Sequence, residues 1–432
     1  MPKTYETSYS EILLLHSLMK ESAEHMQSKK NCTLLVFLFT FSWSFAQEKT
    51  QMLPHIDSVE YLLTNQTVQI ECTSGVDNLY NFKFKSAESQ FHWLRRFYPA
   101  HPLPYFLLGL SNWWKIAPNI DEEKYDEMFL SYMDSSIYFA EKLLDKNEEN
   151  IEASFFLAGA YGFKGRLYSE RKNWTKAAIA GKRALKYMEY SRQKDDLSPE
   201  LLFGDGLYNY YSVWIPENYP MLKPILWLFD KGDKELGITQ LKIVAREAFY
   251  TRIEAQYFLM RIYAIEEEKP IEALRIAEYL HSTYPDNPYF HRFHARMLYQ
   301  TGNYEKLEEV SKSILTKIEN KMPGYEAISG RYASFFLASI YKITRSDLKT
   351  AAKYYQETIK FSEKIEATES GYYLYALTYL AQFAKREDDF ETAFSYYEKV
   401  LENASKKHPT HGEAKEFKKE FRKWKKLQKK EK

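Results

Sequence analysis

The feature that most constrains this chain is a regular placement of small and large apolar residues over most of its 432 residues. In the clearest stretch Ala273 and Ala277 stand four residues apart, and Pro285 follows Ala273 by twelve residues. Leu307 occupies the position of Ala273 in the next copy, 34 residues later. Residues three and four apart share one face of an α-helix, so each segment is predicted to be an amphipathic helix. Such units bury their faces only against one another, which predicts a stack of helix pairs.

Other copies repeat the same small and aromatic residues with varied spacing. They are Ala87-x-x-x-Phe91 with Pro99, Leu157-Ala158 with Ala177, Leu337-Ala338 with Ala351-x-x-x-Tyr355, and Leu380-Ala381 with Ala393-x-x-x-Tyr397. The period and the small residues resemble the tetratricopeptide repeat (TPR) family. The resemblance implies an all-α, superhelical solenoid of about eight helix hairpins with a C-terminal capping helix. With only 15 Gly and 15 Pro the chain has too few turn-forming residues for an all-β fold, and a non-repeating helical bundle is the alternative.

One stretch departs from the simple repeat. Residues 201–245 carry Gly204-Asp205-Gly206, a linker with three prolines, and a second glycine pair, and they are similar to a segment of the mitochondrial outer-membrane and inclusion-body family of TPR proteins. The resemblance implies a longer hairpin at 199–247 and no catalysis. The apolar insertion at Leu222–Phe229 is expected to pack in the core, with a lid or a membrane contact as alternatives.

Residues 26–47 have the pattern of a secretory signal of the bacterial envelope type. Met26 precedes two lysines and an apolar run, and Ser44 and Ala46 place small residues before a cleavage site at Gln47. We therefore expect residues 1–46 to be an upstream extension and signal peptide, with translation starting at Met26, and an exported protein of the periplasm or envelope. The alternative is a cytosolic protein in which this run is buried. Cys72 is the one cysteine after the signal, so an internal disulfide is excluded.

No residue pattern of an enzyme is found. The chain has no phosphate-binding glycine loop with a Lys-Ser/Thr pair and no Gly-x-Ser-x-Gly motif. His291 and His294 share a helix face, but no further ligands with metal spacing accompany them. The sequence therefore predicts a binding protein with no catalytic residues, no cofactor and no metal.

The concave surface of the predicted solenoid is the candidate binding site. In TPR proteins the first helix of each hairpin lines this surface, and aligning the repeats there brings basic and aromatic residues together. The predicted site consists of Arg261, Tyr289, Arg292, Arg296, Tyr332, Lys342, Tyr375 and Lys385. Arginine binds carboxylates with two parallel hydrogen bonds, and tyrosine packs against side chains, so the pattern favours a protein or peptide partner. Ordinary solvated helix residues, or a receptor for a small anionic or glycan ligand, are the alternatives.

The C-terminal segment is strongly basic. Residues 406–432 hold eleven Lys and one Arg against four Glu, a net charge of +8 in a chain whose total is +1. The rest of the chain, with the predicted solenoid at 47–405, is therefore acidic, and nucleic acid is not the expected partner. The basic tail leaves a peripheral contact with an anionic membrane surface open.

The export hypothesis predicts the mass of the mature protein. Protein isolated from fractionated native cells is expected to begin at Gln47 and to be found in the envelope fraction, because signal peptidase removes the segment before it. Intact mass with N-terminal peptide mapping measures this directly. A cytosolic protein that retains residues 1–46 would refute the hypothesis.

Overall fold

The computed structural model describes residues 61–191, 198–218 and 231–431, and within these ranges it contains seventeen α-helices and no strand. The all-α solenoid predicted from the repeats is confirmed. The predicted signal at 26–47 and the apolar insertion at Leu222–Phe229 lie outside the described residues.

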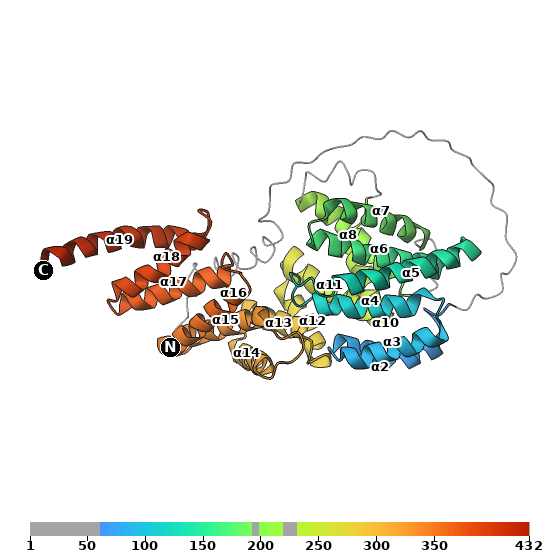
Figure 1. Ribbon diagram of the computed structural model, residues 1–432, viewed down its shortest axis with the longest axis horizontal. Helices are drawn as coiled ribbons and strands as arrows, with labels where there is room; N and C mark the ends of the chain where they lie inside the picture. Colours follow the sequence, from blue (N-terminus) through green and yellow to red (C-terminus); the bar gives the residue numbers. More distant parts are fainter. Residues whose placement is uncertain (1–60, 192–197, 219–230, 432) are drawn as a thin grey trace, which may run out of the picture.

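Helices adjacent in the sequence pack against each other in pairs, and eight such hairpins precede a final helix in the described part of the chain. The first helices of the hairpins are α2 (Gln66–Tyr80), α4 (Pro102–Ile116), α6 (Ile151–Glu170), α8 (Leu202–Asn218), α11 (Arg252–Arg261), α13 (Pro288–Gln300), α15 (Ala327–Ile343) and α17 (Gly371–Arg386). The second helices are α3 (Phe84–Phe97), α5 (Asp126–Lys146), α7 (Trp174–Ser191), α10 (Lys234–Glu247), α12 (Pro270–Thr283), α14 (Tyr304–Glu319), α16 (Leu348–Lys364) and α18 (Phe390–Asn403), followed by α19 (Pro409–Glu431). A π-helical segment, η3 (Ile262–Glu266), continues α11. The arrangement is a TPR-like helical repeat (Figure 1).

The small residues of the repeat lie where the two helices of a hairpin meet the next hairpin. Ala273, Ala351 and Ala393 are completely buried, and the tyrosines four residues after the last two, Tyr355 and Tyr397, are buried as well. The absence of a larger side chain at the alanine positions lets the helices approach closely, and the tyrosines fill the space between neighbouring hairpins.

Several helices begin where the sequence supplies a capping side chain. The carboxylate or amide oxygens of Asn150, Asp233, Asn287, Asp347 and Asp389 each accept a hydrogen bond from a backbone N–H in the first turn of the helix that follows. Such caps satisfy donors that have no partner within the helix and each contributes about 1 kcal/mol. The hairpin boundaries are thus encoded locally.

The first hairpin contacts the start of α13, which lies more than 200 residues away in the sequence. The amide of Asn287 donates to the backbone oxygen of Tyr80 at 2.8 Å, and the backbone N–H of Asp286 donates to Asn81 Oδ1 at 2.9 Å. One continuous apolar core accordingly runs from residue 63 to residue 297. A second core covers residues 295–421, so α13 is the element that the two cores share.

A buried carboxylate joins the helices inside the first core. Glu254 on α11 is 3% exposed, and its Oε1 accepts hydrogen bonds from Tyr80 OH at 3.1 Å and from Trp114 Nε1 at 2.7 Å. Burial raises the pKa of Glu254, while these two donors act in the opposite direction. The bonds hold α2, α4 and α11 at fixed positions around one point.

The final helix covers the last hairpin, as the capping prediction requires. The three aromatic rings of α19 stack on three rings of α18, in the pairs Phe417–Tyr397, Phe421–Phe394 and Trp424–Phe390, with ring centroids 4.8, 4.3 and 5.2 Å apart. In Figure 1 this helix forms the end of an arm that extends away from the N-terminal hairpins. No helix in the described ranges has both the length and the apolar character needed to cross a bilayer.

Two glycines allow a close approach of α8 and α10. A Cβ atom on Gly237 would lie 2.7 Å from the backbone oxygen of Gly206 and 2.7 Å from the backbone nitrogen of Tyr210. Backbone atoms cannot rotate away as the end of a side chain can, so a side chain at this position requires the two helices to separate.

We expect Gly237→Ala to destabilise the protein by about 1–3 kcal/mol, because overpacking outweighs the gain in helix propensity. Gly162→Ala on α6 is the matched control, since a Cβ there meets no atom within 4 Å. That variant is expected to be unchanged or stabilised by up to about 1 kcal/mol. Urea unfolding followed by circular dichroism measures both, and equal stability of the two variants would contradict the close-packing argument.

Candidate functional site

Arginine and tyrosine side chains lie close together on the first helices of five hairpins, α6, α11, α13, α15 and α17. We call this surface the inner face. The members of this Arg–Tyr ladder are Arg166 on α6, Tyr257 and Arg261 on α11, Tyr289, Arg292 and Arg296 on α13, Arg331 and Tyr332 on α15, and Tyr372 on α17. Every member except Arg296 contacts another member through a hydrogen bond, a cation–π contact or ring packing. Arg296 lies over the ring of Phe293 and acts electrostatically on Tyr332.

The N-terminal part of the ladder is centred on Tyr257. Its hydroxyl accepts hydrogen bonds from Arg166 Nη2 at 2.6 Å and from Arg261 Nη1 at 3.0 Å. The guanidinium of Arg166 also lies over the ring of Trp113, 4.5 Å from its centroid. Because Trp113 belongs to α4, three hairpins contribute to this part of the inner face.

The direction of the pKa shift of Tyr257 indicates positive charge at this part of the inner face. Burial favours a raised pKa for Tyr257, but the two guanidinium groups outweigh burial and lower that pKa. The closest carboxyl groups compensate little of this charge: burial raises the pKa of Glu254, and burial raises the pKa of Glu266 to about 7 despite the opposing charge of Arg261. Both shifts reduce the share of ionised carboxylate beside the arginines near neutral pH.

The C-terminal part of the ladder is centred on Tyr332. The guanidinium groups of Arg292 and Arg331 lie 5.7 and 5.4 Å from the centroid of its ring, and the ring of Tyr372 lies 4.6 Å away. Arg331 also contacts Tyr372, at 5.6 Å from its ring centroid. Burial again favours a raised pKa for Tyr332, and the surrounding arginines again outweigh burial and lower it.

Most of these arginines have buried N–H groups without an acceptor. The nitrogens concerned are Arg166 Nη1, Arg261 Nε, Arg296 Nη2 and Arg331 Nε. None of the five ladder arginines forms an ion pair with a carboxylate of the described residues. A buried donor without an acceptor costs about 1–3 kcal/mol, and more when it is charged. The inner face therefore carries positive charge and buried donors that no described side chain satisfies.

Five of the eight residues of the predicted site lie in the ladder: Arg261, Tyr289, Arg292, Arg296 and Tyr332. The predicted set lacks Arg166, Tyr257, Arg331 and Tyr372. Tyr372 lies three residues before the predicted Tyr375, so the two tyrosines share a helix face one turn apart. Comparing residues one turn either side of the aligned position identifies Tyr372, whereas Arg166 comes from a divergent repeat and has no such signal.

The other three predicted residues lie elsewhere. Lys385 Nζ forms an ion pair with Glu420 Oε2 on α19, at 2.6 Å. Tyr375 packs near His408, with 5.4 Å between the ring centroids, and Lys342 Nζ lies 3.5 Å from the ring centroid of Tyr379. The capping helix and the segment before it thus take up the end of the inner face.

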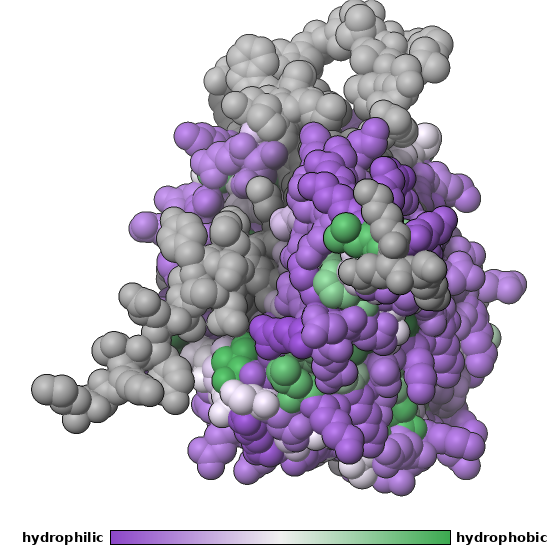
Figure 2. All heavy atoms as spheres, turned by 90° about the vertical axis from the view of Figure 1, so that its left-hand side faces the viewer, coloured by the Kyte–Doolittle hydropathy of each residue, from purple (hydrophilic) through white to green (hydrophobic). Residues whose placement is uncertain are grey.

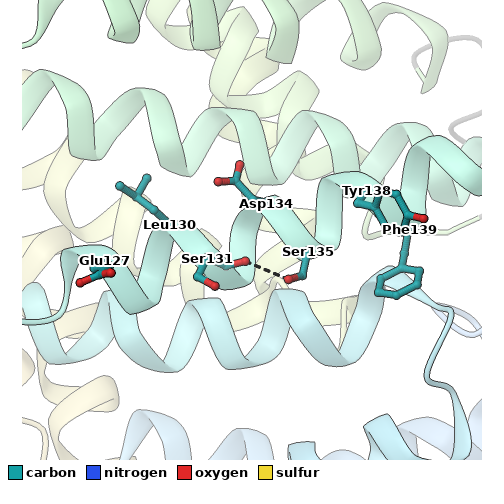
Figure 3. A pocket seen from close by; sticks show the side chains of 7 residues that line it. All are labelled: Glu127, Leu130, Ser131, Asp134, Ser135, Tyr138 and Phe139. Atoms are coloured by element: carbon teal, nitrogen blue, oxygen red, sulfur yellow. Dashed lines mark hydrogen bonds between the residues drawn. The ribbon is translucent and has the colours of Figure 1, made fainter.

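A hollow on α5 is the other candidate site on the surface. All of its lining residues come from this single helix, namely Glu127, Leu130, Ser131, Asp134, Ser135, Tyr138 and Phe139 (Figure 3). Ser135 donates to the backbone oxygen of Ser131, and Asp134 pairs with Lys164. The hollow is open to solvent and formed by one helix, so it encloses little of a ligand.

His291 and His294 lie in the core with a third histidine, His281. The rings of His281 and His291 are stacked with centroids 4.0 Å apart, and the His281–His294 distance is 5.3 Å. His291 Nδ1 is 2.9 Å from Tyr325 OH. No group of three or more His, Cys, Asp or Glu in the described ranges is arranged to hold a metal ion. We therefore interpret the three rings as packed core residues.

Comparisons with known proteins give distant structural likeness only. The sequence matches no protein-family model and no curated protein. Among solved structures, the human IFIT1 dimer with PPP-AAAA is 15% identical over 77% of this chain and 72% of its own, with a TM-score of 0.42. Yeast Tom70 is 12% identical over 83% of this chain and 82% of its own, with a TM-score of 0.34. The P58(IPK) TPR domain is 15% identical over 82% and 99%, with a TM-score of 0.23. The description as a TPR-like repeat rests on the helix pairing of this chain.

The histidine cluster predicts a loss of stability in acid. Burial lowers the pKa of His281 to about 3 and that of His294 to about 4, against 6.5 for an exposed imidazole. Below pH 6.5 the unfolded chain takes up protons that the folded chain does not, so the free energy of unfolding falls as the pH drops towards 4. His294→Gln removes one such group and is expected to make the fall shallower, by up to about 1.4 kcal/mol per pH unit.

Urea unfolding at pH 7, 6, 5 and 4 measures this dependence. His411→Gln on α19 is the control for removal of an imidazole at another place in the fold. Identical pH profiles for His294→Gln and the unmodified protein would show that the cluster does not remain neutral in the folded state.

Proposed function

We propose that this chain is a non-catalytic scaffold that holds a protein or peptide partner against its inner face, and that it works in the cell envelope after export. The TPR-like fold supplies a row of aligned helices, which is a surface suited to an extended ligand. The signal-like segment at 26–47 supports the location. The observation that carries the proposal is the Arg–Tyr ladder, whose guanidinium groups have no carboxylate partners.

The contrast with basic residues outside the ladder supports this reading. Arg171 donates two hydrogen bonds to Asp126, at 2.6 and 2.8 Å, and Lys385 pairs with Glu420. Those charges are balanced within the chain. The ladder arginines are partly or almost wholly buried and are left unbalanced, which destabilises the free protein and favours the binding of an anion.

The chemistry of the ladder indicates the nature of the partner. A guanidinium group binds a carboxylate through two parallel hydrogen bonds, and tyrosine supplies rigid packing area beside it. The ladder spans several hairpins, so an extended segment with several acidic groups satisfies more of it than a single carboxylate does. We infer an acidic peptide segment of a larger protein as the partner.

The surface outside the ladder agrees with polar recognition. The face seen from the C-terminal end is mostly hydrophilic and carries only small apolar clusters (Figure 2). The large exposed aromatic side chains include Trp93, Phe97 and Tyr138, which lie on the second helices α3 and α5 and not on the inner face. A glycan, which stacks on exposed rings, is therefore a poorer fit to the inner face than an anion is.

The basic tail is proposed to act separately from the ladder. Its aromatic residues face α18, and its lysines extend into solvent along α19. A helix of this kind is suited to weak contact with anionic lipid headgroups. This contact would place the scaffold near a membrane surface without an anchor.

Charge reversal tests the proposed binding face. The double variant Arg292→Glu and Arg296→Glu is expected to weaken binding of a fluorescent, Asp/Glu-rich 12-residue peptide at least about tenfold, because two charge-assisted contacts become repulsive. Fluorescence anisotropy measures the affinity. A neutral peptide, with Asn and Gln in place of Asp and Glu, is the ligand control. The unmodified protein is expected to bind it no more tightly than the double variant binds the acidic peptide.

The control carries the same change in charge outside the ladder. Arg246 and Arg275 are exposed on α10 and α12, so Arg246→Glu with Arg275→Glu is expected to bind the acidic peptide normally. Crosslinking of both double variants in envelope fractions extends the test to native partners. Equal peptide affinity and equal crosslinks for the two double variants, with retained helicity, would refute binding at the inner face.

A further inference from the structure

Three arginines gather around Tyr332 more densely than anywhere else in the ladder. Arg292 and Arg296 come from α13 and Arg331 comes from α15, so two neighbouring hairpins supply the cluster. Arg292 and Arg331 lie 5.7 and 5.4 Å from the Tyr332 ring centroid. Arg296 acts on the same tyrosine and on Tyr372 electrostatically. We call Arg292, Arg296 and Arg331 the arginine triad.

Arg292 is held in place by two neutral acceptors. Its Nη1 donates to Ser329 Oγ at 3.1 Å, and its Nη2 donates to the backbone oxygen of Pro118 at 3.1 Å. Neither acceptor carries a charge, so the guanidinium is oriented but not neutralised. Burial lowers the pKa of Arg292, and the nearby charge of Arg331 acts in the same direction. The site therefore brings like charges together without compensation.

The other two members have donors left over. Arg296 is only 9% exposed, and its Nη2 is buried with no acceptor. Arg331 Nε is likewise buried with no acceptor. A buried charged donor without an acceptor is costly, and an anion bound beside the partly exposed Arg331 offsets that cost through its charge.

The number of charges in the triad indicates which anion fits. A carboxylate brings one negative charge and two oxygens, and a single forked guanidinium already balances that charge and binds both oxygens. A phosphate monoester brings a charge of about −1.5 to −2 and three acceptor oxygens. Three arginines near one tyrosine match the charge of the second group better than that of the first.

We propose that the arginine triad binds a dianionic phosphate group, which anchors the ligand of the inner face at Tyr332. The proposal rests on the proposed function, because it assigns one specific contact within the same ladder. The proposal specifies phosphate as the anchoring group. It also assigns a binding role to Arg331, which the charge pattern of the sequence does not reveal. Phosphate is supplied either as a small free ester or on a side chain of the partner, and these two sources are separated by experiment.

Phosphorus NMR of the unmodified protein with inorganic phosphate is the first measurement. Binding is expected to shift or broaden the phosphate signal at millimolar concentration, and acetate at equal concentration is expected not to displace it. A peptide with one phosphoserine is then compared with the same peptide carrying glutamate. If the phosphopeptide binds at least about tenfold more tightly than the glutamate peptide, the phosphate is carried on a partner. If inorganic phosphate and the phosphopeptide bind equally, the ligand is a free phosphate. Both results support the triad.

Variants of Arg331 connect the signal to the triad. Arg331→Gln is expected to weaken phosphate or phosphopeptide binding about tenfold or more, and Arg331→Lys is expected to be intermediate, because lysine is a point charge without a forked donor. Arg345→Gln is the matched control, since Arg345 is exposed near the end of α15 and pairs with Glu308. If Arg331→Gln fails to fold, the intermediate effect of Arg331→Lys still decides the outcome.

Two results would overturn the inference. Equal affinity for the phosphoserine and glutamate peptides shows that the triad reads only negative charge. Equal affinity of Arg331→Gln and Arg345→Gln for phosphate shows that the triad is not the site. In either case, retained binding of the Asp/Glu-rich peptide leaves the proposed function standing, whereas loss of all anion binding in the unmodified protein removes both.

Discussion

The close stacking of helix hairpins is the constraint on which the rest of this protein depends. A hairpin cannot bury both of its apolar faces alone, so each pair of helices requires the next. Fully buried alanines such as Ala273, Ala351 and Ala393 let the pairs approach, and this approach brings the first helices side by side. Residues at one position of successive repeats then form a row. The Arg–Tyr ladder combines several such positions, so its geometry follows from the packing of apolar residues outside it.

The N-terminal hairpins add a second constraint to simple stacking. The carboxyl group of Glu254 accepts hydrogen bonds from α2 and α4, and Asn287 binds the end of α2. These contacts join segments far apart in the sequence into one core that ends at α13. Beyond its start, where Arg292 on α13 binds Pro118, the arm from α13 to α19 packs between neighbouring hairpins. The ladder crosses from one part to the other at α13, so a ligand held along it contacts both.

The sequence predicts the repeats well because their signal is local. Alanine spacing, capping residues and the aromatic residues of α19 each act within a hairpin or between neighbours, and they place the eight hairpins and the cap correctly. The ladder is predicted only in part, because its position depends on helix rotation. A shift of one turn separates Tyr375 from Tyr372, and the sequence pattern does not distinguish them. Contacts such as Arg292 with Pro118 join distant repeats and have no sequence signal at all.

The aromatic seam between α18 and α19 has a further consequence for the assembly of the chain. An uncapped solenoid presents its last hairpin as an apolar end, on which another molecule can stack in the same direction. Here Phe417, Phe421 and Trp424 fill that end from within the chain, and lysines cover its outer side. Stacking of another molecule on the last hairpin is thereby blocked at this end by steric occupancy.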